Sequence, residues 1–143
     1  VSPGGLVTPV PLFFYKSNID MEAYKIRNAL KHFRGTTEYN KHLYPGHSPI
    51  YLTDGCMFLR EECNAYWLFD QILKAQSIPK VKSVSFQKWL FSQVKGDLSW
   101  KLTCTNTDDN RVIWSRKLDF FDFPLQRIEI WLIDKVALLP SEY

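Results

Sequence analysis

Long apolar runs are absent from this sequence of 143 residues. A helix that crosses a bilayer needs about 18 or more consecutive apolar residues, and no stretch approaches that length. The N-terminus also lacks the basic start and the apolar block of a secretory signal. We therefore expect a soluble, cytoplasmic protein that has no membrane partner.

Cysteine is scarce, and its three positions, Cys56, Cys63 and Cys104, include no C-x-x-C pair. An odd number without that pair argues against a disulfide framework and fits a reducing compartment, so we expect buried free thiols. His42 and His47 offer further zinc ligands beside Cys56 and Cys63, but their spacing matches no compact zinc module. The chain also has no Gly-rich phosphate loop. We predict neither a metal nor a cofactor.

Aromatic residues, by contrast, are abundant, with ten Phe, seven Tyr and five Trp. The hydrophobic fraction of 45% and the charged fraction of 23% are ordinary for a globular protein. Aromatic packing should therefore dominate the core of one domain that covers residues 1–143. The net charge of +3 is too small to indicate nucleic acid by itself, because a nucleic-acid footprint requires basic residues clustered on one face.

The stretch from Tyr51 to Gln76 has the most consistent helical character in the chain. Thr53 can cap a helix start, and Asp54 places negative charge near the positive end of the helix dipole. The stretch carries two apolar stripes, and Pro79 follows its end. We predict one long central helix, with a break between Glu61 and Asn64 as the alternative.

The flanking segments complete an α+β fold. Residues 1–17 begin with a segment rich in proline and glycine and should form an irregular arm. Residues 18–78 carry the predicted helical part. Residues 82–140 contain alternating apolar and polar positions that are typical of strands. We expect an antiparallel meander of four to five strands, with the long helix packed on it.

Two side chains, Asp70 and Cys56, are weak candidates for catalysis. A helix N-terminus can lower the pKa of a thiol such as Cys56, but no histidine is tied to it by spacing. Aromatic neighbours can desolvate Asp70 and raise its proton affinity. The alternatives are a surface ion pair with Lys74 or a buried hydrogen bond to loop backbone. An enzyme, in this case a small hydrolase, is therefore the least favoured of three functions.

A possible binding surface combines aromatic and basic residues of the predicted sheet: Trp89, Trp100, Trp114, Arg116 and Trp131. The cations interleaved with the tryptophans of this region are Lys80, Lys82, Lys88, Lys101, Arg111, Arg116 and Lys117. Such interleaving is typical of sheets that stack bases beside phosphates, which makes a nucleic-acid-binding module one alternative. The tryptophans could equally be core residues. The first hypothesis is a non-enzymatic protein-binding or regulatory module that acts through a protein partner or self-association.

Four motifs carry a family resemblance: Tyr51–Gly55, Ala65–Asp70, Asp122–Leu125 and Leu139–Tyr143. On these motifs, and over roughly Leu30 to Tyr143, the chain resembles a bacterial protein family of unknown function that is associated with phage, plasmid and cyanobacterial genomes. The resemblance implies a mobile-element or gene-cassette origin. It implies no activity, cofactor or site residue.

Overall fold

The elements of the fold are seen in a computed structural model that describes residues 22–96, 98–119 and 123–143. Its helices are residues 22–30, α2 (Asp54–Glu62), α3 (Tyr66–Ala75) and α4 (Pro79–Lys82). Its strands and final 3-10 helix are β1 (Asn40–His42), β2 (Ile50–Leu52), β3 (Phe86–Gln93), β4 (Trp100–Asn106), β5 (Arg111–Leu118), β6 (Arg127–Ile133), β7 (Val136–Leu138) and η1 (Pro140–Glu142). The arm predicted at residues 1–17 lies outside the described residues.

The strands form one seven-stranded sheet in the order β1-β2-β7-β6-β3-β4-β5. The long strand β3 pairs antiparallel with both β4 and β6, while the short strands β2 and β7 run parallel. The expected α+β class is confirmed, but the meander of four to five strands is wrong. Strand β6 returns beside β3 rather than β5, and β1 and β2 come from the part predicted as helical. Strands of three residues are too short to show alternation.

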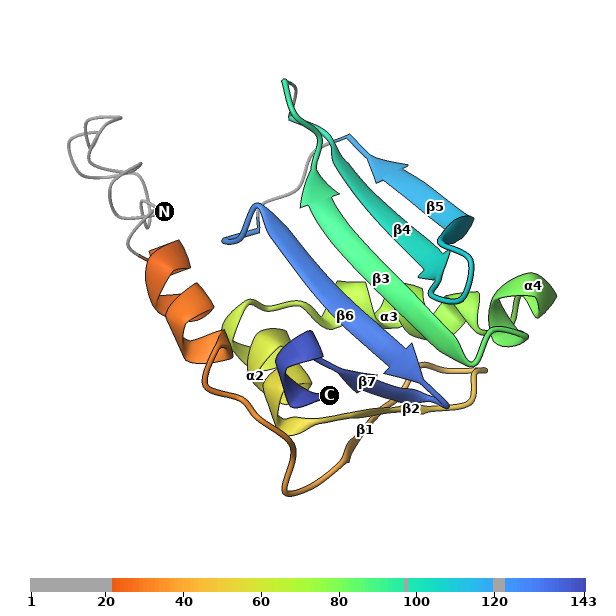
Figure 1. Ribbon diagram of the computed structural model, residues 1–143, viewed down its shortest axis with the longest axis horizontal. Helices are drawn as coiled ribbons and strands as arrows, with labels where there is room; N and C mark the ends of the chain where they lie inside the picture. The colour runs from red at the N-terminus through yellow and green to blue at the C-terminus, as the bar shows by residue number, and fades with distance from the viewer. Residues whose placement is uncertain (1–21, 97, 120–122) are drawn as a thin grey trace.

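The two faces of the sheet have different surroundings (Figure 1). Helix α3 passes behind β3 and β6 and covers the face that carries Trp89, Phe91 and Ile130, each 1% exposed. We call this the inner face. The opposite or outer face carries Phe86 and Lys88 of β3, and in the described part of the chain no helix lies in front of β3, β4 and β5. The hydrophobic core therefore lies between the sheet and its helices.

The stretch predicted as one long helix contains two helices, and strand β2 precedes them in the sequence. Helix α2 ends at Glu62 and α3 begins at Tyr66. Asn64, between them, has φ 51°, a left-handed conformation that cannot continue a right-handed helix. The single helix is therefore wrong and the alternative break is confirmed. The start is also as predicted, because the Thr53 hydroxyl accepts a hydrogen bond from the backbone N–H of Cys56 (3.4 Å).

Among the described residues, every helix is too short or too polar to cross a membrane.

Candidate nucleic-acid interface

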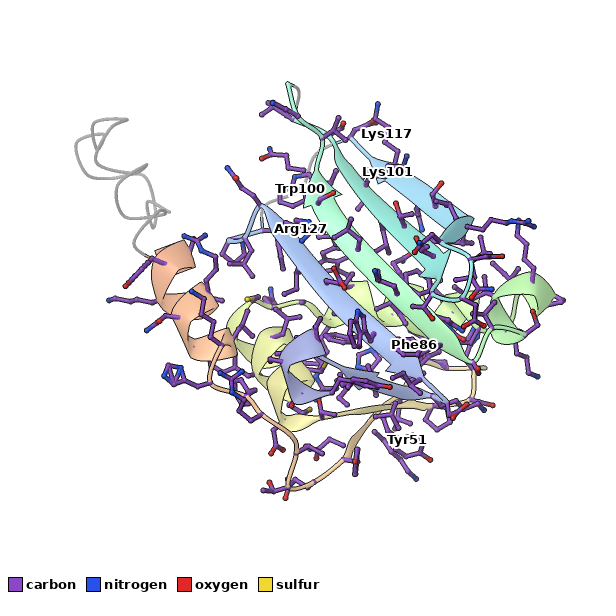
Figure 2. All side chains as sticks on the ribbon, in the orientation of Figure 1. Tyr51, Phe86, Trp100, Lys101, Lys117 and Arg127 are labelled. Carbon is purple, nitrogen blue, oxygen red and sulfur yellow. The ribbon has the colours of Figure 1, made fainter. Side chains whose placement is uncertain are left out.

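A row of cations crosses the outer face of the sheet. Lys117 of β5 pairs with Lys101 of β4, Lys101 pairs with Ser92 of β3, and Ser92 pairs with Arg127 of β6. Adjacent strands lie about 4.8 Å apart, so the row spans about 14 Å. Lys101, Lys117 and Arg127 are exposed and lie at the same end of the strands (Figure 2). We call these three residues the cationic row.

Like charges stand directly opposite each other in the cationic row. Cross-strand neighbours of the same sign, such as Lys101 and Lys117, destabilise a sheet by roughly 0.2–1 kcal/mol. Among the described residues on the outer face of β3 to β6, the carboxylate is that of Glu129, and it lies near the row. It accepts a hydrogen bond from Trp131 Nε1 (2.6 Å) and lies 3.7 Å from the Arg127 guanidinium. Glu129 therefore offsets the charge of Arg127, and Lys101 and Lys117 leave the row with an excess of positive charge.

Aromatic rings gather toward the other end of the same face. Trp131 contacts both Phe86 and Tyr143, with ring centroids 5.3 Å apart in each pair. Tyr143 is 76% exposed, and Phe86 and Trp131 are half-buried. Lys88 stands directly opposite Trp131 in the β3–β6 ladder. This aromatic cluster of Phe86, Trp131 and Tyr143 therefore presents ring surface beside an ammonium group.

The five residues predicted as a binding surface do not share one face. Trp89 and Trp100 are core residues, 1% and 3% exposed, and Trp114 packs against the Trp89 ring at 5.3 Å. Arg116 also lies on the inner side, where its guanidinium donates a hydrogen bond to Gln71 of α3 (2.7 Å). Only Trp131 of the five lies on the outer face. The alternation of β3 to β5 places the other four on the opposite side.

Lys88, Lys101 and Lys117 belong to the basic pattern of the sequence and do lie on the outer face, whereas sequence reasoning missed Arg127 and Tyr143. Arg127 joins this face through the pairing of β6 with β3, and Tyr143 joins it because the C-terminus folds back onto β6. Neither is visible in a single sequence.

Two distant motifs meet at one carboxylate. Glu142 Oε1 accepts hydrogen bonds from the Thr53 hydroxyl (2.6 Å) and the Leu139 N–H (2.9 Å), and its Oε2 accepts one from the Gly55 N–H (3.0 Å). A Cβ on Gly55 would lie 2.6 Å from Glu142 Oε1. The Glu142 carboxylate therefore occupies the start of α2, where an anionic group is electrostatically favoured. This contact is structural and leaves no free donor for a substrate there.

Asp70 is the partner of a buried histidine. His42, 2% exposed, donates from Nε2 to Asp70 (2.7 Å), and its Nδ1 accepts from the Arg60 guanidinium (3.0 Å). An arginine can only donate, so Nδ1 carries no proton and the ring is neutral. Burial lowers the pKa of His42, against the hydrogen bond and charge of Asp70. Lys74, the partner suggested by the sequence, lies instead over the Tyr44 ring.

With both of its ring nitrogens engaged and the ring buried, His42 is not placed to move a proton to or from a substrate. The same engagement removes His42 from the zinc ligand set considered from the sequence. In the described ranges, no group of three or more His, Cys, Asp and Glu residues is arranged to hold a metal ion.

The three cysteines are buried free thiols, as predicted. Burial raises the pKa of Cys63 to about 11 and that of Cys104 to about 12. It raises the pKa of Cys56 still further, and Cys56 is 0% exposed. A thiol that stays protonated and inaccessible is not a nucleophile.

Residues 24–143 match a family model that is described as a family of unknown function. The chain belongs to DUF6876. No curated protein and no solved structure matched it. The expected membership in an uncharacterised family is confirmed. The DUF6876 match includes the cationic row, the aromatic cluster and both partners of the Gly55–Glu142 contact.

Proposed function

We propose that this DUF6876 chain is a non-enzymatic binding module that holds single-stranded nucleic acid on the outer face of its sheet. The observation that carries the proposal is the cationic row, Lys101, Lys117 and Arg127, in which no carboxylate stands. A row of like charges costs stability in the free protein and becomes favourable when a polyanion neutralises it.

The aromatic cluster supports an unpaired strand rather than a duplex. Trp131 lies four residues from Arg127 along β6, a distance of about 13 Å. A strand whose phosphates lie on the cationic row and near Lys88 can place a base against the Trp131 or Tyr143 ring. Unpaired bases stack on aromatic side chains with little dependence on sequence, whereas the bases of a duplex are already stacked.

The proposal is tested by fluorescence anisotropy with labelled single strands of about 12 nucleotides and with the matching duplex. At about 50 mM salt, we expect the single strands to bind more tightly than the duplex, and binding to weaken by about 200 mM salt. No anisotropy change at about 100 μM protein would overturn the proposal, because an electrostatic contact should be strongest at low salt.

A matched pair of variants locates the contact. Lys101→Gln with Lys117→Gln removes two charges from the cationic row, and we expect affinity for single strands to fall by about tenfold or more. Lys25→Gln with Lys31→Gln removes two exposed charges from the first helix and its end, which lie away from the sheet. This control should bind like the wild type. Equal losses in both variants would show a non-specific effect of net charge.

A second candidate is the protein-binding or regulatory role first suggested by the sequence. Ile133 and Val136 extend the aromatic cluster as half-buried apolar residues on the outer face, and such patches often mark protein interfaces. Self-association through this patch would appear in sedimentation experiments and be lost in Trp131→Ser. The bacterial or mobile-element origin and the cytoplasmic location remain predictions.

A further inference from the structure

A cavity of about 560 Å³ is lined by the end of α4, the start of β3 and the β6–β7 turn. These elements come together at one end of the sheet (Figure 1). Five segments line the cavity: the loop before β2, the end of α3, the end of α4, the start of β3 and the turn at Asp134 and Lys135. Its volume is within the range of sites for small molecules, about 300–1,000 Å³. It is separate from the cationic row, none of whose residues lines it.

The floor of the cavity is a preformed pair of amides. Gln87, 2% exposed, donates from Nε2 to Gln76 Oε1 (2.9 Å) and accepts from Gln76 Nε2 (2.9 Å). The carbonyls of Val81 and Val84 also lie 2.9 and 3.0 Å from its Nε2, whose two hydrogens are shared among these three acceptors, and its Oε1 accepts from the Trp89 indole. This network fixes both glutamines without a ligand, so the cavity needs no rearrangement of its floor to be occupied.

The rim contains a strained turn. Asp134 and Lys135 have φ 48° and 71°, a left-handed conformation that glycine adopts easily and other residues adopt at a cost. The Asp134 N–H donates to the Ser85 carbonyl (3.1 Å), and the Lys135 carbonyl accepts from the Tyr51 N–H (2.8 Å). Glycine at position 135 would relieve strain but would remove an ammonium group from the cavity. The two-residue turn between β6 and β7 requires a positive φ at both positions, so the hairpin imposes this strain and leaves a lysine side chain at the rim of the cavity.

The lining is cationic and rich in hydroxyl groups, with one apolar wall. The lining contains the ammonium groups of Lys82 and Lys135 and the single carboxylate of Asp134, so its net charge is positive. The hydroxyls of Ser48 and Ser85 make no hydrogen bond to the described residues and are free to donate. Half-buried Pro49 and Val84 supply the apolar wall, with Ile50, Leu73 and Leu132 buried behind it. Ammonium groups and hydroxyl donors are the groups that bind phosphate oxygens.

We propose that this cavity binds a small organic phosphate monoester. Its phosphate contacts Lys82, Lys135 and the free serine hydroxyls, and its carbon skeleton lies against the apolar wall. This site is independent of the nucleic-acid interface: the Lys101→Gln, Lys117→Gln variant should keep it intact.

The test is a ¹H–¹⁵N NMR titration of the full chain with phenyl phosphate, which joins a phosphate to an apolar ring. We expect saturable shifts at the side-chain amides of Gln76 and Gln87 and at the Ser85 amide, with a Kd of about 1 mM or lower. Benzoate and inorganic phosphate should bind at least about tenfold more weakly, because each lacks part of the ligand. Comparable binding of either, or no shift at about 10 mM phenyl phosphate, would overturn the proposal.

Two variants separate binding from folding. Lys135→Gly should weaken phenyl phosphate binding by about tenfold while the melting temperature stays equal or rises, because the substitution relieves the left-handed strain. Lys82→Gln should also weaken binding, whereas Lys80→Gln on the same short helix α4 should not, because Lys80 does not line the cavity. Unchanged affinity in both Lys135→Gly and Lys82→Gln would contradict the site.

Discussion

Glu142 joins the C-terminus of the chain to the start of helix α2. Its carboxylate accepts three hydrogen bonds, from the Thr53 hydroxyl and from the N–H groups of Gly55 and Leu139. Gly55 has no room for a side chain, because a Cβ would lie 2.6 Å from both Glu142 Oε1 and Leu139 Cδ1. The Thr-Asp-Gly and Leu-Pro-Ser-Glu-Tyr motifs are thus two halves of one structural contact.

Gly55→Ala should destabilise the protein. In an open helix this change stabilises by about 1 kcal/mol, but here the added Cβ displaces Glu142 and we expect a net loss of about 1–3 kcal/mol. Urea unfolding followed by circular dichroism measures the loss. The cost should shrink when Glu142→Ala is already present, because the double variant lacks the carboxylate that the Cβ meets. Strict additivity of the two substitutions would contradict the contact.

The stability of the protein should fall as the pH is lowered from about 7 to about 5. Burial lowers the pKa of His42 below its ordinary value of 6.5, so the unfolded chain binds the proton more readily than the folded one. The contribution of neutral His42 is complete above pH 6.5 and is lost as the pH falls through 6.5 toward the folded pKa. His42→Gln should flatten this part of the curve of unfolding free energy against pH. An unchanged curve would show that His42 does not cause the dependence.

Asp70→Ala should cost about 1–3 kcal/mol, since it leaves the His42 Nε2–H without its acceptor in a buried site. Asp108→Ala, in the exposed turn between β4 and β5, is the matched control and should change the free energy of unfolding by less than about 0.5 kcal/mol. A loss for Asp70→Ala as small as that of the control would mean that the His42–Asp70 hydrogen bond contributes nothing to stability.

At the scale of elements, the joint between α2 and α3 depends on Asn64, which has φ 51°. Asparagine adopts this left-handed conformation more readily than most residues, and glycine does so freely. Asn64→Gly should leave the melting temperature unchanged or slightly higher, while Asn64→Ala should lower stability by about 1 kcal/mol. Stabilisation by Asn64→Ala would instead favour the continuous helix that the apolar stripes alone suggest.

Local signals in the sequence identified the elements better than their arrangement. The Thr53 cap and the alternation in β4 are short-range patterns, and both are found in the structure. The apolar stripes predict one continuous helix because they run on across Asn64, whereas the backbone changes conformation at that residue. Strands β1 and β2 were missed because three residues show no period. Strand β6 was placed wrongly because its pairing with β3 depends on a long-range contact.

At the scale of the whole molecule, the aromatic residues lie in two environments, because the described helices cover only one face of the sheet (Figure 1). Trp89 and Trp100 are buried in the core on the inner face, whereas Trp131 and Tyr143 lie on the outer face. The sequence could indicate that tryptophans and cations alternate, but not which strand positions face outward together. The cationic row exists only in the register of four strands, so it could not be predicted from one chain.

Removing the like-charge contact should not weaken the fold. In the Lys101→Gln, Lys117→Gln variant, the melting temperature should be equal to or above that of the wild type, because cross-strand repulsion is relieved. Differential scanning calorimetry at low salt measures the effect. A lower melting temperature would show that these lysines support the sheet and are not retained for an anionic ligand.

The central claim, that the outer face holds single-stranded nucleic acid, is tested most directly by the indole N–H signals of the five tryptophans. In an NMR titration with an unlabelled single strand of about 12 nucleotides, at about 50 mM salt, the Trp131 signal should shift with increasing ligand. The signals of the buried Trp89 and Trp100 should stay in place. A stationary Trp131 signal at saturating oligonucleotide, or shifts confined to the inner-face tryptophans, would contradict the account.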